Sequence, residues 1–284
     1  MIKSLEASML NLPYSVEVLA PLCAQHGIEA IGCTRDILGD EKRAAEVGAM
    51  VKDLGLKWGL MPMPADFYHW DLDEEAFEQA LVTLAKEAAV AEKLGATHAY
   101  NHVWSSGPRA FDENFEWHVN RVRRITDILS DHGVHYGLEF LGPHELRSWQ
   151  QHEFVHSLAG VLAIADAAGG KAGIAFDTFH WYTSNNGCID EVLYMVQHAD
   201  RLVALHMNDA VPGRTFDQQK DMERRLPMET GIIDTRDILA RFKAAGNDAL
   251  YMIEPFEPAR TRFHDMTPEA AVAEAAAVFA RLEK

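Results

Sequence analysis

Hydrophobic residues in this chain gather in eight short runs, and longer amphipathic stretches separate these runs from one another. Each run is bounded by turn-forming residues, which is typical of strands that are buried on both faces. The predicted strands are residues 3–9, 29–33, 57–61, 98–103, 135–140, 172–176, 202–207 and 250–254. Alternating strands and helices imply parallel strands joined by right-handed crossovers. Eight such units in 284 residues predict an α/β fold, a closed (β/α)8 TIM barrel rather than an open doubly wound sheet.

The stretches between the runs carry the periodicity and the end signals of helices. Residues 74–94 repeat apolar side chains at the spacing of one helix face, namely Phe77, Leu81, Leu84, Ala88 and Ala91. Residues 273–282 are predicted to form an Ala-rich amphipathic helix. Several predicted helices end at a glycine that is expected to adopt a left-handed conformation: Gly27, Gly55, Gly95, Gly133 and Gly246.

No linker rich in Pro, Gly or Ser divides the chain, so we expect residues 1–284 to form a single barrel domain. Two connections are longer than the others, residues 62–73 after the third predicted strand and 211–231 after the seventh. In a barrel of this class the loops that follow strands lie on the active-site face. We therefore expect both connections at the mouth, with 211–231 covering the substrate as a lid.

Composition narrows the classes of partner. The chain has 26 Lys+Arg against 43 Asp+Glu, a net charge of −17, which disfavours binding to a phosphate backbone. Cys23, Cys33 and Cys188 are scattered and show no paired spacing, which fits a reducing compartment. The chain shows no signal-peptide pattern and no apolar stretch of about 20 residues. We expect a cytoplasmic protein without nucleic acid or membrane partners, with homo-oligomer formation left open.

Four metal-ligating side chains stand at the ends of the last four predicted strands. Glu139, Asp177, His206 and Glu254 each follow an apolar run, so a barrel would bring them together at one mouth. An ionised carboxylate near a core is costly unless it is paired or bound to a metal. Each residue taken alone is more typical of a helix cap or an ion pair, but four successive positions favour a divalent cation. Oxygen and nitrogen ligands suit manganese first, with magnesium, cobalt, iron or zinc as alternatives.

The segments around these residues, GLEFLG, AFDTFH, LHMND and IEPF, resemble those of the xylose-isomerase-like TIM-barrel superfamily. That superfamily includes ketose 3-epimerases, hydroxypyruvate isomerases, inosose dehydratases and isomerases and, more distantly, endonuclease IV. The resemblance implies that Glu139, Asp177, His206 and Glu254 bind one divalent metal. It also implies that Glu139 and Glu254 act as acid and base on opposite faces of a small sugar-like substrate, through a metal-stabilised enediolate.

The same resemblance suggests residues that bind the substrate. His180 completes a DxxH pattern with Asp177, Glu145 matches a substrate-contacting glutamate of the ketose epimerases, and Phe256 follows Glu254 by two residues. Arg214, in ValProGlyArg, resembles an arginine of the hydroxypyruvate isomerases that binds substrate oxygens. Each of these residues also has an interpretation without function: His180 as a helix-capping or surface residue, and Glu145 and Arg214 as solvated charges.

Further candidates lie in the other mouth loops. His102 and His69 are predicted to be pocket or substrate residues. Trp104 and Trp70 are aromatic candidates for the sugar pocket that are equally typical of loop packing, and we expect His102 and Trp104 to bind the substrate. Arg224 and Arg225 precede a segment that resembles the pattern RxxPGxGxID, but Met228 stands where the first glycine belongs and one residue is inserted. We expect one arginine of this loop to face the site, with Arg214 as the first choice.

The prediction is therefore a metal-dependent isomerase or epimerase acting on a sugar, keto-sugar or hydroxy-keto acid. A metal-dependent dehydratase of an inosose or dehydroshikimate-like substrate is the nearest alternative, because it begins with the same proton removal. An abasic-site endonuclease is disfavoured by the acidic charge and by the missing Asp-x-His pair after the seventh strand. A metal-free binding barrel is disfavoured by the four intact ligands. No glycine-rich nucleotide motif is present.

Overall fold

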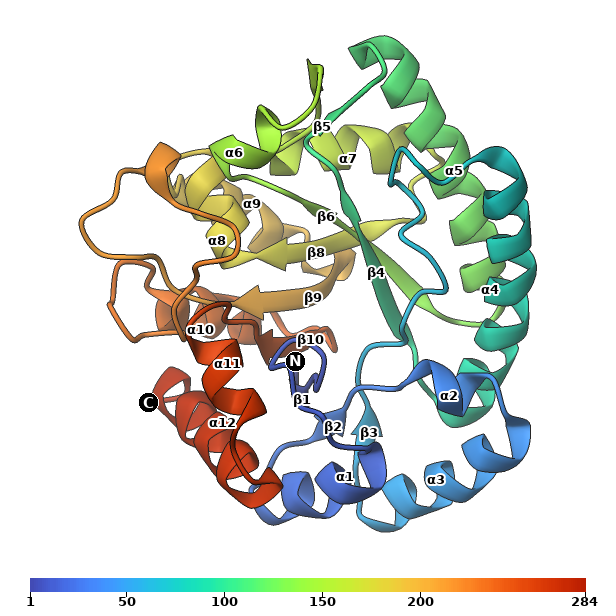
Figure 1. Ribbon diagram of the computed structural model, residues 1–284, viewed down its shortest axis with the longest axis vertical. Coiled ribbons are helices and arrows are strands. Elements are labelled where there is room, and N and C mark those ends of the chain that lie inside the picture. Colours follow the sequence, from blue (N-terminus) through green and yellow to red (C-terminus); the bar gives the residue numbers. More distant parts are fainter.

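The computed structural model describes residues 1–284, and its strands form a parallel barrel. The strands pair in the order β3-β2-β1-β10-β9-β8-β6-β4, and a parallel bridge between Leu60 and His98 joins the two ends of this sheet. Figure 1 shows the strands in the centre with the helices around them. The barrel strands are β1 (Ile2–Leu5), β2 (Ala30–Ile31), β3 (Lys57–Trp58), β4 (His98–Val103), β6 (His135–Phe140), β8 (Gly173–Asp177), β9 (Leu202–Met207) and β10 (Leu250–Ile253).

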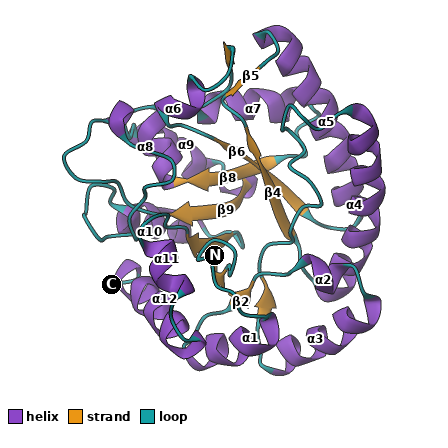
Figure 2. Ribbon diagram, viewed as in Figure 1, coloured by secondary structure: helices purple, strands orange, loops and turns teal.

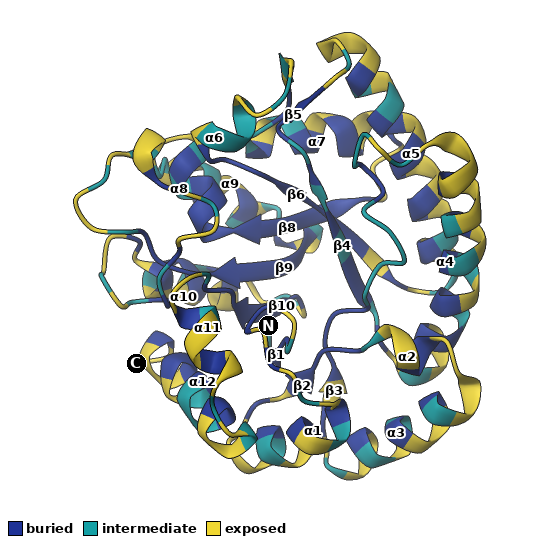
Figure 3. Ribbon diagram, viewed as in Figure 1, coloured by how far each residue is buried: buried dark blue, intermediate teal, exposed yellow.

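Helices cover the outside of the barrel, as Figure 2 shows. Their outward faces are exposed and their inward faces are buried (Figure 3), the division expected of amphipathic helices on a sheet. The helices are α1 (Val16–Gln25), α2 (Arg35–Leu38), α3 (Glu41–Asp53), α4 (Glu74–Leu94), α5 (Phe111–Asp131), α6 (His144–Arg147), α7 (Leu158–Ala167), α8 (Thr178–Ser184), α9 (Ile189–Gln197), α10 (Thr235–Ala245), α11 (Ala259–His264) and α12 (Pro268–Leu282), with short 3-10 turns η1 (Ala199–Arg201) and η2 (Phe216–Gln218). No helix is both long enough and apolar enough to span a membrane.

Local signals account for where the helices begin and end. The Asp73 carboxylate accepts a hydrogen bond from Ala76 N and caps α4, and Gly95 ends that helix with φ 79°. All five glycines that were predicted to end helices have positive φ. The predicted helix 74–94 has the bounds of α4, and the helix predicted at 273–282 begins earlier, at Pro268 of α12.

Two features of the sheet differ from the prediction. The first strand stops at Leu5 rather than residue 9, because the carbonyl of Glu6 accepts hydrogen bonds from Met9 N and Leu10 N and the chain turns there. The chain also forms a small two-stranded antiparallel sheet outside the barrel, between β5 (Ser106–Gly107) and β7 (His152–Glu153). Each of its strands has two residues, too few to give a periodic signal.

The barrel interior is filled by side chains, which confines chemistry to its mouth. Inward-facing apolar residues from several strands form a compact cluster, namely Met9, Leu60, Ala175, Ala204, Leu250 and Met252. A larger apolar core lies between the strands and the helices. Polar side chains inside the barrel therefore lie above the apolar cluster, where the strands end.

Candidate active site

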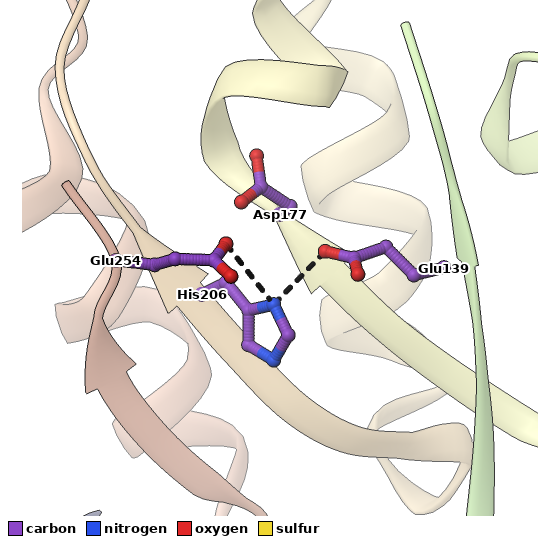
Figure 4. A group of neighbouring side chains, drawn as sticks. All are labelled: Glu139, Asp177, His206 and Glu254. Atoms are coloured by element: carbon purple, nitrogen blue, oxygen red, sulfur yellow. Dashed lines mark hydrogen bonds and ion pairs between the residues drawn. The ribbon is translucent and has the colours of Figure 1, made fainter. Parts of the chain in front are cut away.

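Glu139, Asp177, His206 and Glu254 come together at the carboxyl ends of four neighbouring strands. Glu139 and His206 are the next-to-last residues of β6 and β9, Asp177 is the last residue of β8, and Glu254 directly follows β10. One ligand atom from each side chain can be chosen so that all four atoms lie within 4.8 Å of one another. Figure 4 shows the four side chains pointing toward a common centre. The expected convergence is therefore present in the structure.

His206 and Asp177 are held by different kinds of contact. His206 Nδ1 lies 2.9 Å from Glu139 Oε1 and 3.5 Å from Glu254 Oε2. Asp177 uses Oδ1 as a helix cap, accepting hydrogen bonds of 2.7 Å from Phe179 N and from His180 N at the start of α8. The glutamate contacts hold the imidazole of His206 between Glu139 and Glu254. The backbone N–H groups at the start of α8 orient the Asp177 carboxylate.

Burial and mutual charge shift the pKa values of these groups. Burial raises the pKa of Asp177 to about 7, against the lowering effect of Arg224. Burial also acts to raise the pKa of Glu139, but the imidazoles of His206 and His102 outweigh it and hold that pKa well below its usual range. For His206 burial acts to lower the pKa, and the Glu139 and Glu254 carboxylates raise it well above its ordinary value. The ionised carboxylates of this buried cluster are thus stabilised by neighbouring positive charge.

The hydrogen bonds and the ligand types of the cluster fit a divalent cation. Glu139 Oε2 is fully buried and accepts no hydrogen bond of good geometry, although His102 Nε2 lies 3.0 Å away. Three carboxylates and one imidazole, with no thiolate, form a donor set suited to hard or borderline metals. A cation at the centre would offset the repulsion among the three carboxylates and would satisfy the free oxygen of Glu139.

Arg224 is the arginine of the mouth loop that reaches this cluster. Its Nη1 lies 3.0 Å from Asp177 Oδ2 and 3.2 Å from Glu254 Oε2, and its Nη2 lies 3.0 Å from His180 Nε2. The side chain is 2 % exposed, and its charge is shared with Asp221, whose Oδ1 accepts from Nη2 at 2.6 Å. A fully buried guanidinium therefore joins the loop to two of the proposed ligands.

The expectation for Arg214 differs from the structure. Arg214 pairs with Glu223 within the same loop, and both side chains are partly exposed. Arg225 does not reach the cluster either, because its backbone forms a two-residue bridge with Asp209. The position that sequence reasoning gave to Arg214 is therefore occupied by Arg224. The physical reason is that the Arg224 guanidinium pairs with the buried carboxylates of Asp177 and Glu254, whereas Arg214 pairs with Glu223 within the loop.

His180 lies beside the cluster, whereas Glu145 makes a contact that was not expected. His180 is 1 % exposed, and burial followed by the charge of Arg224 lowers its pKa well below the usual value. Glu145 Oε1 accepts a hydrogen bond of 2.8 Å from Asp221 N, and its Oε2 pairs with Lys220 at 2.9 Å. Glu145 thus fastens the loop 211–231 to α6, and its contact with the substrate stays a prediction.

Aromatic side chains from separate loops gather at the rim. Trp70 lies with ring centroids 5.7 Å from Trp104 and 5.2 Å from Trp149, and His69 stacks on Trp70 at 4.3 Å. Trp104 also donates from Nε1 to Asp66 Oδ2 at 2.7 Å. Trp149 is 54 % exposed and was not identified from the sequence, because an isolated tryptophan in a polar loop carries no periodic signal.

Phe256 and His102 lie on different sides of the four-residue cluster. The Phe256 ring is half-buried and faces the guanidinium of Arg224, with 4.5 Å between the ring centroid and Cζ. His102 Nε2 approaches Glu139, and its side chain is 40 % exposed. Burial acts to lower the pKa of His102, but Glu139 raises it to about 9. His102 is therefore a cation beside a carboxylate at the mouth.

Asp209 and Met228 shape the loop 211–231, which runs from β9 toward α10 at the left edge of Figure 1. The Asp209 carboxylate is fully buried and accepts hydrogen bonds from the backbone N–H groups of Ala210, Thr230, Gly231 and Ile233. Met228 has φ 60°, a left-handed conformation that explains why the family pattern has glycine at this point. Asp209 was missed because its role depends on residues more than twenty positions away.

Comparison with known proteins agrees with this architecture. The family model of the xylose isomerase-like TIM barrel matches residues 20–282, so the chain belongs to that family. A search of curated protein sequences finds no match. A xylose isomerase domain protein from Alicyclobacillus acidocaldarius subsp. acidocaldarius superposes with TM-score 0.80 at 25% identity, covering 99% of this chain and 98% of that one.

Two further solved structures share the fold at lower identity. IOLI protein with a bound zinc atom superposes with TM-score 0.79 at 17% identity, covering 99% of this chain and 98% of that one. A D-psicose 3-epimerase with D-tagatose, from Clostridium cellulolyticum H10, superposes with TM-score 0.73 at 15% identity, again covering 99% and 98%. At these identities the likeness establishes a shared barrel.

Proposed function

We propose that this protein is a divalent-metal-dependent isomerase or epimerase of a small sugar-like carbonyl compound. The observation that carries the proposal is the convergence of Glu139, Asp177, His206 and Glu254 within 4.8 Å at the mouth of the barrel. Family membership adds weight, because solved structures of the same fold include an epimerase and a protein with bound zinc. Manganese is the first candidate metal, and magnesium, cobalt, iron and zinc are alternatives.

The four clustered residues would hold the metal, which when bound supplies Lewis-acid polarisation of the substrate carbonyl. Glu139 and Glu254 then divide the proton transfer. They extend from β6 and β10, which β8 and β9 separate in the barrel, so their carboxylates approach the centre from different sides. One glutamate removes a proton from the carbon beside the carbonyl, and the other returns a proton to the opposite face or to the neighbouring carbon.

The surrounding residues set the ionisation state of Glu139 and exclude water from the site. His102 and His206 keep Glu139 ionised, so it is ready to accept a proton. Arg224 contacts Glu254 and Asp177 and closes the centre from the loop side. Because Arg224 and Glu254 are both buried, the proton transfer takes place where little water reaches.

Proton exchange with solvent tests the proposal directly. Metal-loaded protein is incubated in D2O with ketoses, inososes and short hydroxy-keto acids, and deuterium incorporation is followed by NMR. We expect deuterium at the carbon beside the carbonyl, accompanied by the epimeric or isomeric product. Loss of water from the labelled compound would reassign the protein to the dehydratases. If a fully metal-loaded protein exchanged no proton from any of these compounds, the proposal would be wrong.

A further inference from the structure

Glu6 occupies the same level of the barrel as the proposed ligand Glu254. Strands β1 and β10 pair in register with Lys3 opposite Tyr251, and Glu6 follows β1 directly as Glu254 follows β10. Glu6 is only 5 % exposed. It therefore belongs to the ring of polar residues at the strand ends, on β1, which lies next to β10 and two strands from β9, where the loop of Arg224 begins.

The two strands next to β1 leave space for the Glu6 carboxylate. Gly32 follows β2, and a Cβ atom at that position would lie 2.1 Å from Glu6 Oε2. Gly59 follows β3, and a Cβ atom there would lie 2.3 Å from Glu6 Oε1. Any other residue at either position would displace the carboxylate, so the location of the Glu6 carboxylate depends on glycine at both positions.

One oxygen of Glu6 is committed to the protein and the other is free. Oε1 accepts hydrogen bonds from Ser4 Oγ at 2.5 Å and from Leu60 N at 3.1 Å. No hydrogen bond reaches Oε2. Glu6 lines a cavity of about 310 Å³ that is also lined by Asn101 and His102. This volume is at the small end of the range for ligand sites, roughly 300–1,000 Å³, and suits a single monosaccharide.

The charge of this cavity is negative. Asp66 is the second carboxylate in its wall, and no lysine or arginine lines it. His102, the one basic side chain in the wall, lies with its Nε2 3.0 Å from Glu139 Oε2 and so already faces a carboxylate. Burial raises the pKa of Glu6 to about 7, so the carboxyl group is largely ionised above that pH. An anionic group entering this cavity would therefore meet two carboxylates and no lysine or arginine in its wall.

We propose that Glu6 is a substrate-binding residue whose free oxygen accepts a hydrogen bond from a substrate hydroxyl remote from the reacting carbonyl. Glu6 and Asp66 together select neutral polyhydroxylated compounds over carboxylated or phosphorylated ones. This inference rests on the proposed function, and it specifies the substrate class. A neutral ketose or cyclitol ketone satisfies the cavity, whereas a short keto acid or a dehydroshikimate-like carboxylate does not.

Paired probes that differ by one carboxylate test the inference. D-tagatose is compared with D-tagaturonate and D-fructose with D-fructuronate, using metal-loaded protein and titration calorimetry at pH 8.5, where Glu6 is ionised. We expect wild-type protein to bind each neutral ketose at least 10-fold more tightly than its uronate. Glu6→Gln should weaken binding of the neutral ketoses by about 10- to 100-fold, the loss typical of a hydrogen bond to a charged group, and should narrow the preference against the uronates.

Two further variants separate the position of the carboxylate from its charge. Gly32→Ala retains the charge but pushes Oε2 from its place, so neutral ketoses should bind about 10-fold more weakly while uronates remain excluded. Glu46→Gln removes an exposed charge on α3, where the Glu46 side chain is 67% exposed, and should leave all affinities unchanged. Circular dichroism and metal content establish that each variant is folded and loaded.

Each result decides the question. Equal affinity of wild-type protein for a ketose and its uronate, no binding of either ketose, or wild-type affinities in Glu6→Gln would overturn the role of Glu6. Failure of the proposed function looks different, because the ketoses would then bind with the predicted selectivity but exchange no proton with D2O.

Discussion

Arg224 and Asp177 lie 47 residues apart in the chain, yet Arg224 Nη1 and Asp177 Oδ2 are 3.0 Å apart in the structure. Both side chains are buried, at 2 % and 0 % exposure. Asp177 Oδ2 also accepts a hydrogen bond of 2.9 Å from Asn208 Nδ2. A residue of the mouth loop is therefore part of the electrostatic balance of the four-residue cluster.

Arg224→Ala and Arg214→Ala form a matched pair within one loop. Removing Arg224 leaves buried carboxylates without a counter-charge, so the free energy of unfolding of metal-free protein should fall by about 3–5 kcal/mol. Removing Arg214, which pairs with Glu223 in a partly exposed position, should cost less than about 1 kcal/mol. Urea unfolding of both variants measures the difference. Equal losses would mean that Arg224 is not the residue on which the buried charge balance depends.

Asp177→Asn should abolish tight metal retention while leaving the protein folded. The asparagine oxygen can still accept the hydrogen bonds from Phe179 N and His180 N that cap α8, but the ligand charge is lost. Elemental analysis after gentle purification should find one divalent metal per wild-type chain and little in the variant. Three metals per chain, or an unchanged metal content in Asp177→Asn, would contradict the mononuclear site.

Glu139→Gln and Glu254→Gln should reduce proton exchange by about 10²- to 10⁴-fold, the usual contribution of a positioned acid or base. Glutamine keeps an oxygen for the metal but cannot accept the proton. Exchange rates in D2O are compared at full metal occupancy, and sugar affinity is measured separately by calorimetry. Normal exchange by either variant would exclude its glutamate from the proton transfer.

Asp209→Asn should loosen the loop 211–231 without affecting the metal. The Asp209 carboxylate accepts backbone hydrogen bonds from both ends of this loop, and the amide can replace only part of them. Trypsin cleavage within the loop, at Arg214 or Lys220, should become faster, and KM should rise because the lid closes less often. Wild-type cleavage rates in the variant would show that Asp209 does not hold the loop.

His118 should make the protein less stable in acid. Burial lowers its pKa in the folded state to about 3, whereas an unfolded histidine titrates near 6.5. Between these values the unfolded chain binds more protons, so stability is complete above about pH 6.5 and declines as the pH falls toward 3, by up to ~1.4 kcal/mol per pH unit.

His118→Phe tests this dependence. The His118 ring stacks on Tyr68 at 5.1 Å and on Phe154 at 4.7 Å, contacts that phenylalanine retains. The variant loses the hydrogen bond of His118 Nδ1 with Asn114 O, so its stability at neutral pH is expected to be lower. Its free energy of unfolding, measured in urea at pH 6.5, 5.5 and 4.5, should nevertheless decline less steeply. Identical slopes for the two proteins would rule out His118 as the titrating group.

Local patterns in the sequence were sufficient for the barrel and for the four clustered residues. The predicted strands at 98–103, 135–140 and 202–207 have the bounds of β4, β6 and β9, because continuous apolar runs are a property of the segment itself. Parallel strands in a barrel all end at the same face, so the convergence of Glu139 and His206 followed from topology alone.

The loops and the remaining polar contacts depended on tertiary structure. The sequence around Arg214 and Arg224 does not show which of the two arginines faces the site. Arg224 points inward because its guanidinium pairs with Asp177, the last residue of β8. Glu145 is turned toward the loop by the backbone of Asp221, 76 residues further along. Glu6 reaches the mouth cavity because Gly32 and Gly59 leave room beside it. Such contacts join segments that are distant in the chain, and their energies depend on burial and distance, which the order of residues does not contain.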